Sequence, residues 1–333
     1  MRLEDIIAII TLVSLILYAL MGGADFGGGL WDLAATGPRR REQRETISNA
    51  IAPVWEANHV WLILVIVLLF TAWPPAFAAM MTALHIPITA MLIGIVLRGA
   101  TFVFRKYDSK RDEVQRRWSR IFGISSVFTP FAQGLVLGAL ATGEIRIDHG
   151  VISTGFFAGW LSPFAIACGA FALVLFAFLA ATYLTADPAA SADVKDDFRK
   201  RALLSQSILL PVAAVVFFTS RHEAPEMYRG LTNWWAPLLL IWTILAAITA
   251  TVTLLKRRFE LARIAAIFQV TSILIGWCVA QYPYLLYPDL TIRNSAAPEI
   301  TLRLLLIALG LGAVVLLPSV YYLFHIFKGS AAR

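Results

Sequence analysis

The sequence consists largely of apolar runs that are each about as long as a membrane is thick. Hydrophobic residues make up 59% of the 333 residues, charged residues only 15%, and the mean hydropathy is +0.73. A soluble protein is far less apolar than this. A hydrocarbon core of about 30 Å requires about 20 helical residues, and runs of that length recur to the end of the chain. The sequence therefore predicts an all-α, polytopic integral membrane protein without a separate soluble domain.

We expect nine transmembrane helices in a single membrane subunit, residues 1–333. The spans are residues 5–33, 49–71, 75–104, 118–141, 154–183, 203–219, 233–255, 261–282 and 300–327. The first run lacks a small-residue cleavage site and carries an acid in its interior, which predicts a retained helix and not a signal peptide. Two prolines at 74–75 predict a tight turn between spans. Residues 186–201 are the candidate hinge between two halves, and residues 282–299 are expected along the membrane interface.

Lys and Arg residues alternate between the connections. They are frequent after the first, third, fifth and seventh spans, whereas the intervening connections contain only Arg146, Arg221, Arg229 and Arg293. Connections rich in Lys and Arg remain in the cytoplasm, so the N-terminus is predicted outside and the C-terminus inside. These loops explain the net charge of +7, which therefore does not indicate nucleic-acid binding. The basic loop 105–120 can also attract anionic membrane lipid.

Three ionisable residues lie within consecutive expected spans at a similar depth. Asp25 is about 12 Å, Glu56 about 10 Å and Arg98 about 9 Å from the cytoplasmic ends of their helices. A charge inside a bilayer costs about 2.5 kcal/mol or more, so such residues are functional candidates. Asp25 and Glu56 can form a proton pathway fed from the cytoplasm. Alternatively, Asp25 and Arg98 can form a structural ion pair, and both interpretations can hold together.

Polar residues accompany Glu56 on its helix. His59 follows by three residues and shares its face, whereas Asn58 points elsewhere and can bond to a neighbouring helix. His85 is expected near mid-membrane, at a depth close to that of His59. Two such histidines can ligate a haem, and the alternative is that they are polar side chains that join helices.

Neither the glycines nor the cysteines predict a cofactor site. Gly23 and Gly27 have the four-residue spacing that lets two membrane helices pack closely. No strand precedes the glycine-rich stretch, so a phosphate-binding loop is not expected. Cys168 and Cys278 lie in apolar runs without a zinc or redox spacing, which predicts buried thiols and no metal.

Several motifs resemble the second subunit of cytochrome bd-type quinol oxidases, and the resemblance extends over the whole chain. They are GADFGGG at residues 23–29, SNAIAPVWEANHVW at 48–61, AWP at 72–74, LRxxxFxxR at 97–105, YPYxxxP at 282–288 and PSVYYLFHIFK at 318–328. The first two motifs are specific, and the others support them.

The resemblance implies a heterodimer in the cytoplasmic (inner) membrane of a bacterium. Subunit I would carry two b-type haems and one d-type haem, oxidise quinol and reduce O2 with protons from the cytoplasm. This chain would bind no haem and would fold as two four-helix bundles, residues 1–141 and 154–282, with a peripheral ninth helix, residues 300–327. A structural quinone, membrane lipid and a small single-helix accessory subunit are further candidate ligands and partners.

The resemblance also implies roles for single residues. Glu56 matches the acid of a proton path, and Asp25 and Arg98 match residues that support the haem region. Trp61 matches a tryptophan beside a route for oxygen. Relatives often carry an aspartate where Gly22 stands, so the proton path is expected to differ in detail.

The leading hypothesis is a non-haem subunit that scaffolds subunit I and helps to deliver protons to it. Delivery of O2 to subunit I is a further expectation. A stand-alone proton-coupled transporter could also use Asp25 and Glu56, although an odd span count and the lack of a visible inverted repeat speak against it. The third hypothesis is a haem-ligating electron-transfer subunit that uses His59 and His85.

Overall fold

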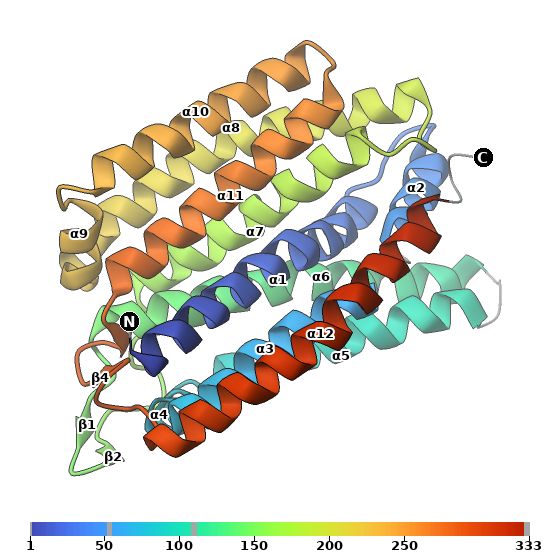
Figure 1. Cartoon of the computed structure of the whole chain (residues 1–333). Coiled ribbons are helices and arrows are strands. Elements are labelled where there is room, and N and C mark those ends of the chain that lie inside the picture. The colour runs from blue at the N-terminus through green and yellow to red at the C-terminus, as the bar shows by residue number, and fades with distance from the viewer. Residues whose placement is uncertain (1, 52–54, 108–111, 330–333) are drawn as a thin grey trace.

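The computed structural model describes residues 2–51, 55–107 and 112–329, and this part of the chain is mostly helical. The helices are α1 (Leu3–Leu33), α2 (Arg40–Ile51), α3 (Trp55–Ala72), α4 (Pro74–Ala83), α5 (His85–Tyr107), α6 (Asp112–Thr142), α7 (Pro163–Thr185), α8 (Ala192–Glu223), α9 (Pro225–Leu231), α10 (Ala236–Leu255), α11 (Phe259–Gln281) and α12 (Glu299–Gly329). Two antiparallel hairpins pair β1 (Ile147–Asp148) with β2 (Val151–Ile152), and β3 (Tyr284–Leu286) with β4 (Leu290–Thr291). The long helices run side by side (Figure 1).

Most of the long helices have the dimensions of membrane spans. Within the described ranges, eight are long and apolar enough to cross a membrane: α1, α5, α6, α7, α8, α10, α11 and α12. The bent pair α3–α4 makes a ninth if it is taken as one span. The start of α1 and the end of α12 lie at opposite ends of the molecule, as an odd number of crossings requires (Figure 1). We call these two ends the hairpin end, which holds α4 and the hairpins, and the α2 end.

The helices pack in two connected groups. α7, α8, α10 and α11 form a ring in which each helix packs against two of the others. α1 packs against α7 of the ring and also against α3 and α6, so it joins the ring to these two helices. α5 in turn packs against α6. α12 packs against α1 and α3 at the periphery.

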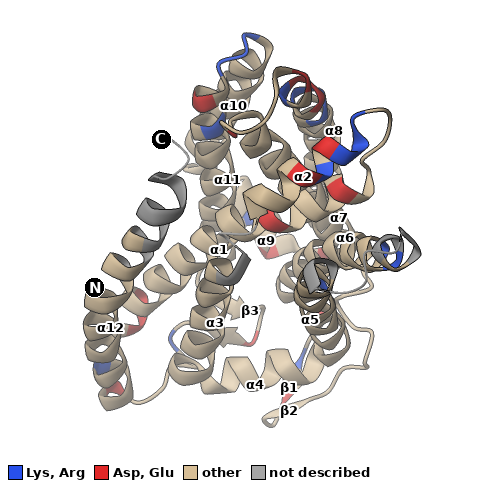
Figure 2. Ribbon diagram, turned by 90° about the vertical axis from the view of Figure 1, so that its right-hand side faces the viewer, with Lys and Arg blue, Asp and Glu red and all other residues tan. Residues whose placement is uncertain are grey.

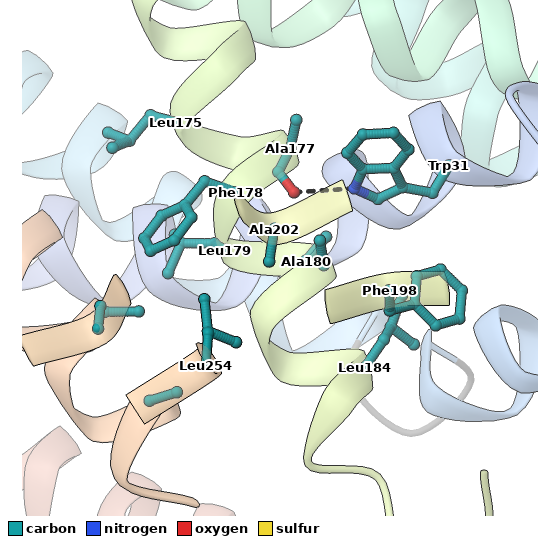
Figure 3. Close-up of a cluster of buried hydrophobic side chains, with 14 of the residues drawn as sticks. Trp31, Leu175, Ala177, Phe178, Leu179, Ala180, Leu184, Phe198, Ala202 and Leu254 are labelled. Carbon is teal, nitrogen blue, oxygen red and sulfur yellow. Dashed lines mark hydrogen bonds between the residues drawn. The ribbon is translucent and has the colours of Figure 1, made fainter. Parts of the chain in front are cut away.

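The ring has an apolar core that also receives one side chain from α1. Phe178 of α7, Phe198 of α8 and Leu254 of α10 are fully buried there (Figure 3). Trp31 of α1 lies against the same cluster and donates its indole N–H to the carbonyl of Ala177 at 2.8 Å. A buried indole needs such a partner, and this bond holds the α2 end of α1 against α7.

The expected span 75–104 is wrong, because the structure divides it into two helices. α4 is bent by 117° from α3, and only α5 is long and straight enough to cross a membrane. Trp73 precedes Pro74 and has a non-helical backbone, as a residue before proline tends to have. Pro87 lies in the first turn of α5, where its missing N–H is not required. The span therefore starts at His85 and not at residue 75.

The boundaries of the fifth and sixth spans also differ from the expectation. α7 starts at Pro163 instead of residue 154, because Ser162 caps it by accepting a hydrogen bond from the Ala165 N–H at 3.1 Å. α8 starts at Ala192, where Ser191 caps it in the same way. The second half of the expected hinge 186–201 is therefore regular helix, and this N-terminal extension of α8 begins eleven residues before the expected start of the span at residue 203.

The basic connection after α1 contains an amphipathic helix. α2 includes most of it and buries Gln43, Ile47 and Ile51 while Arg40 and Arg41 are exposed. Residues 49–51, expected as the start of the second span, belong to this helix, and the span itself is α3. Figure 2 shows charged residues gathered around α2 and the adjoining part of α8, whereas most of the remaining ribbon is uncharged.

The connection 282–299 is fastened to the ends of the first helices. Its main chain accepts a hydrogen bond from the Trp73 indole at Ile292, 2.9 Å, and donates one from Ala297 to Ala72 at 2.8 Å. Trp73 is fully buried by this contact. The hairpin β3–β4 thus covers the bend between α3 and α4.

Candidate functional site

A buried ion pair and a buried amide meet between α1, α3 and α5. Arg98 of α5 pairs through Nη2 with Oδ1 of Asp25, and donates from the same nitrogen to the Asp25 main-chain oxygen at 3.1 Å. Asn58 of α3 donates from Nδ2 to Oδ2 of Asp25 at 2.7 Å. Asp25 and Arg98 are each 1% exposed and Asn58 is 0% exposed. Donors therefore hold both oxygens of the carboxylate.

The Arg98 guanidinium is enclosed on its other sides as well. Its centre lies 4.8 Å from the centroid of the Phe26 ring and 5.0 Å from that of the Phe122 ring, within the range of a cation–π contact. Nε donates to the Ser126 hydroxyl at 3.1 Å. Water is excluded around a charge pair of this kind, so the loss of either partner would leave an uncompensated charge.

The glycines of α1 allow the neighbouring helices to come this close. A Cβ on Gly27 would lie 2.0 Å from the main-chain oxygen of Phe176 in α7, and one on Gly23 would lie 2.9 Å from a side chain of α7. A Cβ on Gly29 would lie 2.1 Å from the Ser126 hydroxyl oxygen. Only a hydrogen fits at these positions, so the backbone of α1 contacts α6 and α7 directly beside Asp25.

α3 carries the other residues expected at the site. Glu56 belongs to the first turn of α3, but its side chain lies outside the described part of the structure, so its proton role stays a prediction. His59 is half-buried. Trp61 is 8% exposed and packs in a cluster with Tyr18 and Phe26, on the same side of α3 as Asp25. The expected oxygen route beside Trp61 also stays a prediction.

The two histidines expected at one depth lie toward opposite ends of the molecule. His85 is exposed at the start of α5, where Nδ1 bonds to the carbonyl of Thr82 at 2.8 Å and the ring packs against Phe156. His59 lies on α3, about 20 Å along the helix axis from the bend between α3 and α4, which is the end of the molecule where α5 begins. The expectation of matching depth is wrong because the third span starts at His85. Among the described residues, no three His, Cys, Asp or Glu side chains are grouped as metal ligands.

The cysteines are free thiols in separate helices. Cys168 is buried in α7, where α6 approaches so closely that a Cβ on Gly134 would lie 2.3 Å from the Cys168 main-chain oxygen. Cys278 is half-buried in α11. Cys168 thus belongs to the contact between the two helix groups.

Sequence reasoning missed two buried polar groups on the same face of α1 as Asp25. Tyr18 stands seven residues before Asp25, is 3% exposed, and bonds through its hydroxyl to Gln133 of α6. Asp32 stands seven residues after Asp25 and is 1% exposed. A spacing of seven is two helical turns, so the pattern was visible in the sequence. Asp32 lies at the end of an expected span, where an acid is ordinarily solvated, but in the structure Arg44 of α2 packs against it.

A second polar cluster fastens α2 to α8. Asp197 accepts two hydrogen bonds from Arg39, at 2.9 and 2.7 Å, and one from Gln43 at 2.7 Å. Arg201 donates to Gln43 at 2.8 Å and lies against the Trp31 ring. The cluster holds the connection between the first two spans against the extension of α8.

Comparisons with known proteins place the chain among subunits of one enzyme complex. The family model described as cytochrome bd terminal oxidase subunit II matches residues 3–327. A putative cytochrome bd menaquinol oxidase subunit II of Bacillus subtilis is 26% identical over 322 residues, which cover 93% of this chain and 91% of that protein. The cytochrome bd-I ubiquinol oxidase subunit 2 of Escherichia coli K12 is 26% identical over 316 residues, which cover 85% and 81%.

The fold is shared with a solved structure. A chain of the bd oxidase from Geobacillus thermodenitrificans superposes with a TM-score of 0.82 and 24% sequence identity. The match covers 98% of this chain and 99% of the other. At this level of identity the likeness concerns the arrangement of the helices.

Proposed function

Because the chain belongs to the family of cytochrome bd terminal oxidase subunit II, we propose that it is the non-haem subunit of a quinol:O2 oxidoreductase in a bacterial inner membrane. Its partner is a haem-bearing subunit I, which oxidises quinol and reduces O2 to water. This chain scaffolds subunit I and helps to deliver protons to it. The observation that carries the proposal is the buried cluster of Asp25, Arg98 and Asn58 within the membrane-spanning part of a chain that matches the family along nearly all its length.

The chain crosses the membrane nine times in this proposal, with the bent pair α3–α4 as the second crossing. Its two helix groups correspond to residues 1–141 and 154–282, and α12 is the peripheral ninth helix. The α2 end faces the cytoplasm, because the Lys- and Arg-rich connections lie there. The start of α1 then lies outside and the end of α12 inside.

Asp25 and Glu56 have separate tasks. Arg98 of α5 and Asn58 of α3 each donate to one oxygen of Asp25, so this carboxylate ties the three helices together. Asp25 therefore mainly keeps α1, α3 and α5 in position. Glu56, two residues before Asn58 on α3, is the better carrier of protons from the cytoplasm.

His59 and His85 lie toward opposite ends of the molecule, so these two histidines are not placed to ligate one haem between their helices. This supports a division in which subunit I holds two b-type haems and one d-type haem, which supply the electron transfer and the oxygen chemistry. This chain holds helices in place and moves protons, with Trp61 beside the route for O2.

The test compares Glu56→Gln and Glu56→Asp in the complete oxidase. The amide cannot carry a proton whereas the shorter acid can, so we expect Glu56→Gln to slow quinol-dependent O2 consumption and Glu56→Asp to retain most of it. Haem content, measured from the absorption spectrum, should be the same in both variants. Full activity of Glu56→Gln would remove Glu56 from the proton path. Purification of the chain from native membranes without a haem-bearing partner would reject the subunit assignment.

A further inference from the structure

We propose that the corner where the N-terminal part of α8 meets the turn between α10 and α11 binds an anionic phospholipid of the cytoplasmic leaflet. The phosphate of the lipid lies against Lys200, Lys256 and Arg258, which we call the headgroup site. The acyl chains lie along the exposed apolar residues of α8 and α10. This inference goes beyond the proposed function and takes from it only that the α2 end faces the cytoplasm.

An ion pair joins α8 to the turn between α10 and α11 and brings the cations of the two segments together. Asp196 of α8 accepts a hydrogen bond from Arg257 of the turn at 2.7 Å. Lys200 follows Asp196 by four residues, so the two lie on one face of α8. Lys256 and Arg258 flank Arg257 in the chain. The headgroup site is therefore assembled from two segments, and both lie at the α2 end of the molecule (Figure 1).

The headgroup site keeps its positive charge because the acids beside it are paired with other residues. Asp196 is shared between Arg199 and Arg257, and Glu260 pairs with Arg263 at 2.7 Å. The three cations of the headgroup site are exposed, and their side chains form no ion pair or hydrogen bond within the described part of the chain. Three exposed cations at one corner of a membrane protein, at the level where its spans end, attract the phosphates of anionic lipids.

Exposed apolar side chains continue from this corner along the helices toward the middle of the membrane. Leu204, one turn after Lys200 on the same face of α8, is 56% exposed. Leu255, which precedes Lys256 at the end of α10, is 57% exposed, and Leu210 farther along α8 is 77% exposed. Positive charge with apolar surface directly beside it matches the two parts of a phospholipid, an anionic headgroup and apolar chains.

A soluble anion or an acidic peptide would use the cations but not the apolar side chains beside them. The helix α2 at the same end has the opposite arrangement and shows the difference. Arg40 and Arg41 are exposed, Glu45 one turn later is exposed as well, and the apolar Ile47 and Ile51 are buried against the protein. α2 therefore presents charge without an apolar surface and supplies a matched control.

The experiment uses the purified oxidase complex in a neutral detergent and a phosphatidylglycerol with a photoactivatable group in its acyl chain. After illumination, the labelled peptides are identified by mass spectrometry, and we expect label in residues 203–210 of α8 and 251–255 of α10. Unlabelled lipids then compete for the same peptides. Each Lys or Arg near an anionic lipid surface strengthens binding about fivefold, so the three cations should favour phosphatidylglycerol over phosphatidylcholine about a hundredfold.

The variants test whether the cations of this corner cause the preference. Lys200→Gln/Lys256→Gln/Arg258→Gln should abolish it, and Lys200→Gln alone should reduce it about fivefold. The single variant keeps the test decisive if the triple variant does not assemble. The control Arg40→Gln/Arg41→Gln removes two exposed charges from α2 and should leave labelling and preference unchanged. The acid that joins α8 to the turn is intact in every variant.

The remaining outcomes would each overturn the proposal. Equal competition by phosphatidylglycerol and phosphatidylcholine would show that these helices meet lipid without selecting its charge. Competition by inorganic phosphate would show a site for a soluble anion. An equal loss of preference in the α2 variant would show attraction by the net charge of this end. Labelling requires no turnover, so none of these results bears on the proposed function, which the Glu56→Gln measurement of O2 consumption tests separately.

Discussion

The buried ion pair between Asp25 and Arg98 offers a quantitative test by a double-mutant cycle. The single variants are Asp25→Asn and Arg98→Leu, and the third variant combines them. Each single variant leaves one charge, or one set of strong donors, buried without its partner. The double variant removes both charges together.

The structure indicates that each single loss is large. Both side chains are almost fully buried, and two aromatic rings lie against the Arg98 guanidinium, so bulk water does not replace the missing partner. Breaking a buried pair typically costs about 3–5 kcal/mol. The double variant should cost less than the sum of the two, because it leaves no lone charge, and the interaction energy should be about 1–3 kcal/mol.

Thermal denaturation of the purified complex measures the cycle, and the yield of assembled, haem-loaded complex supports it. The control cycle uses Arg41→Leu and Glu45→Gln, whose side chains are 92% and 62% exposed and 3.0 Å apart in one turn of α2. An exposed pair of this kind contributes about 0.2–1 kcal/mol at most. We therefore expect a strong interaction at the buried pair and a weak one at the exposed pair.

Additive effects at the buried pair would refute the reasoning. So would normal stability and assembly of both single variants, because they would show that water reaches the group left behind. A coupling in the control pair as large as that of the buried pair would mean that the assay reports net charge and not burial.

Two further predictions concern packing at and near the site. Gly27→Ala should destabilise the complex by about 1–3 kcal/mol or more, because its Cβ would overlap the main chain of α7. Gly312→Ala is the control and should change the melting temperature little, because a Cβ there would have nothing within 4 Å. Equal effects of the two variants would contradict the close approach of α7. Asp197→Asn should speed tryptic cleavage within α2, because it removes the charge of the partly buried carboxylate that accepts two hydrogen bonds from Arg39. Asp193→Asn is the control and should leave the cleavage rate unchanged, because Asp193 is 77% exposed and lies 3.9 Å from Arg39. Unchanged cleavage of the Asp197 variant would show that other contacts hold α2.

Hydrophobic runs and charge placement predicted the helical membrane fold. Both signals are local: a run of about 20 apolar residues has few alternatives to a membrane helix, and basic loops identify one end of the molecule. The boundaries were less predictable where a helix start depends on its cap or on proline. Ser162 and Ser191 are capping signals that could have been read, but the bend of α4 against α3 depends on Trp73 being buried under the distant hairpin β3–β4.

The candidate site, too, could be predicted from the sequence only in part. Depth along a helix follows from residue number, so the sequence by itself placed Asp25 and Arg98 at one level, and in the structure they touch. Rotation about the helix axis and contact with other helices do not follow from residue number. His85 shows this limit, because a shift in the start of α5 moved it from the middle of the span to its end.

The sequence alone determined that this is a polytopic helical membrane protein, which end carries the positive charge, and which ionisable residues lie inside the spans. Only the tertiary structure decided which of them meet. Asn58 holds Asp25, Ser126 fills the place of a side chain at Gly29, and α2 folds over Asp32. These contacts join residues that are far apart in the chain, and their geometry depends on how closely the glycines of α1 let its neighbours approach.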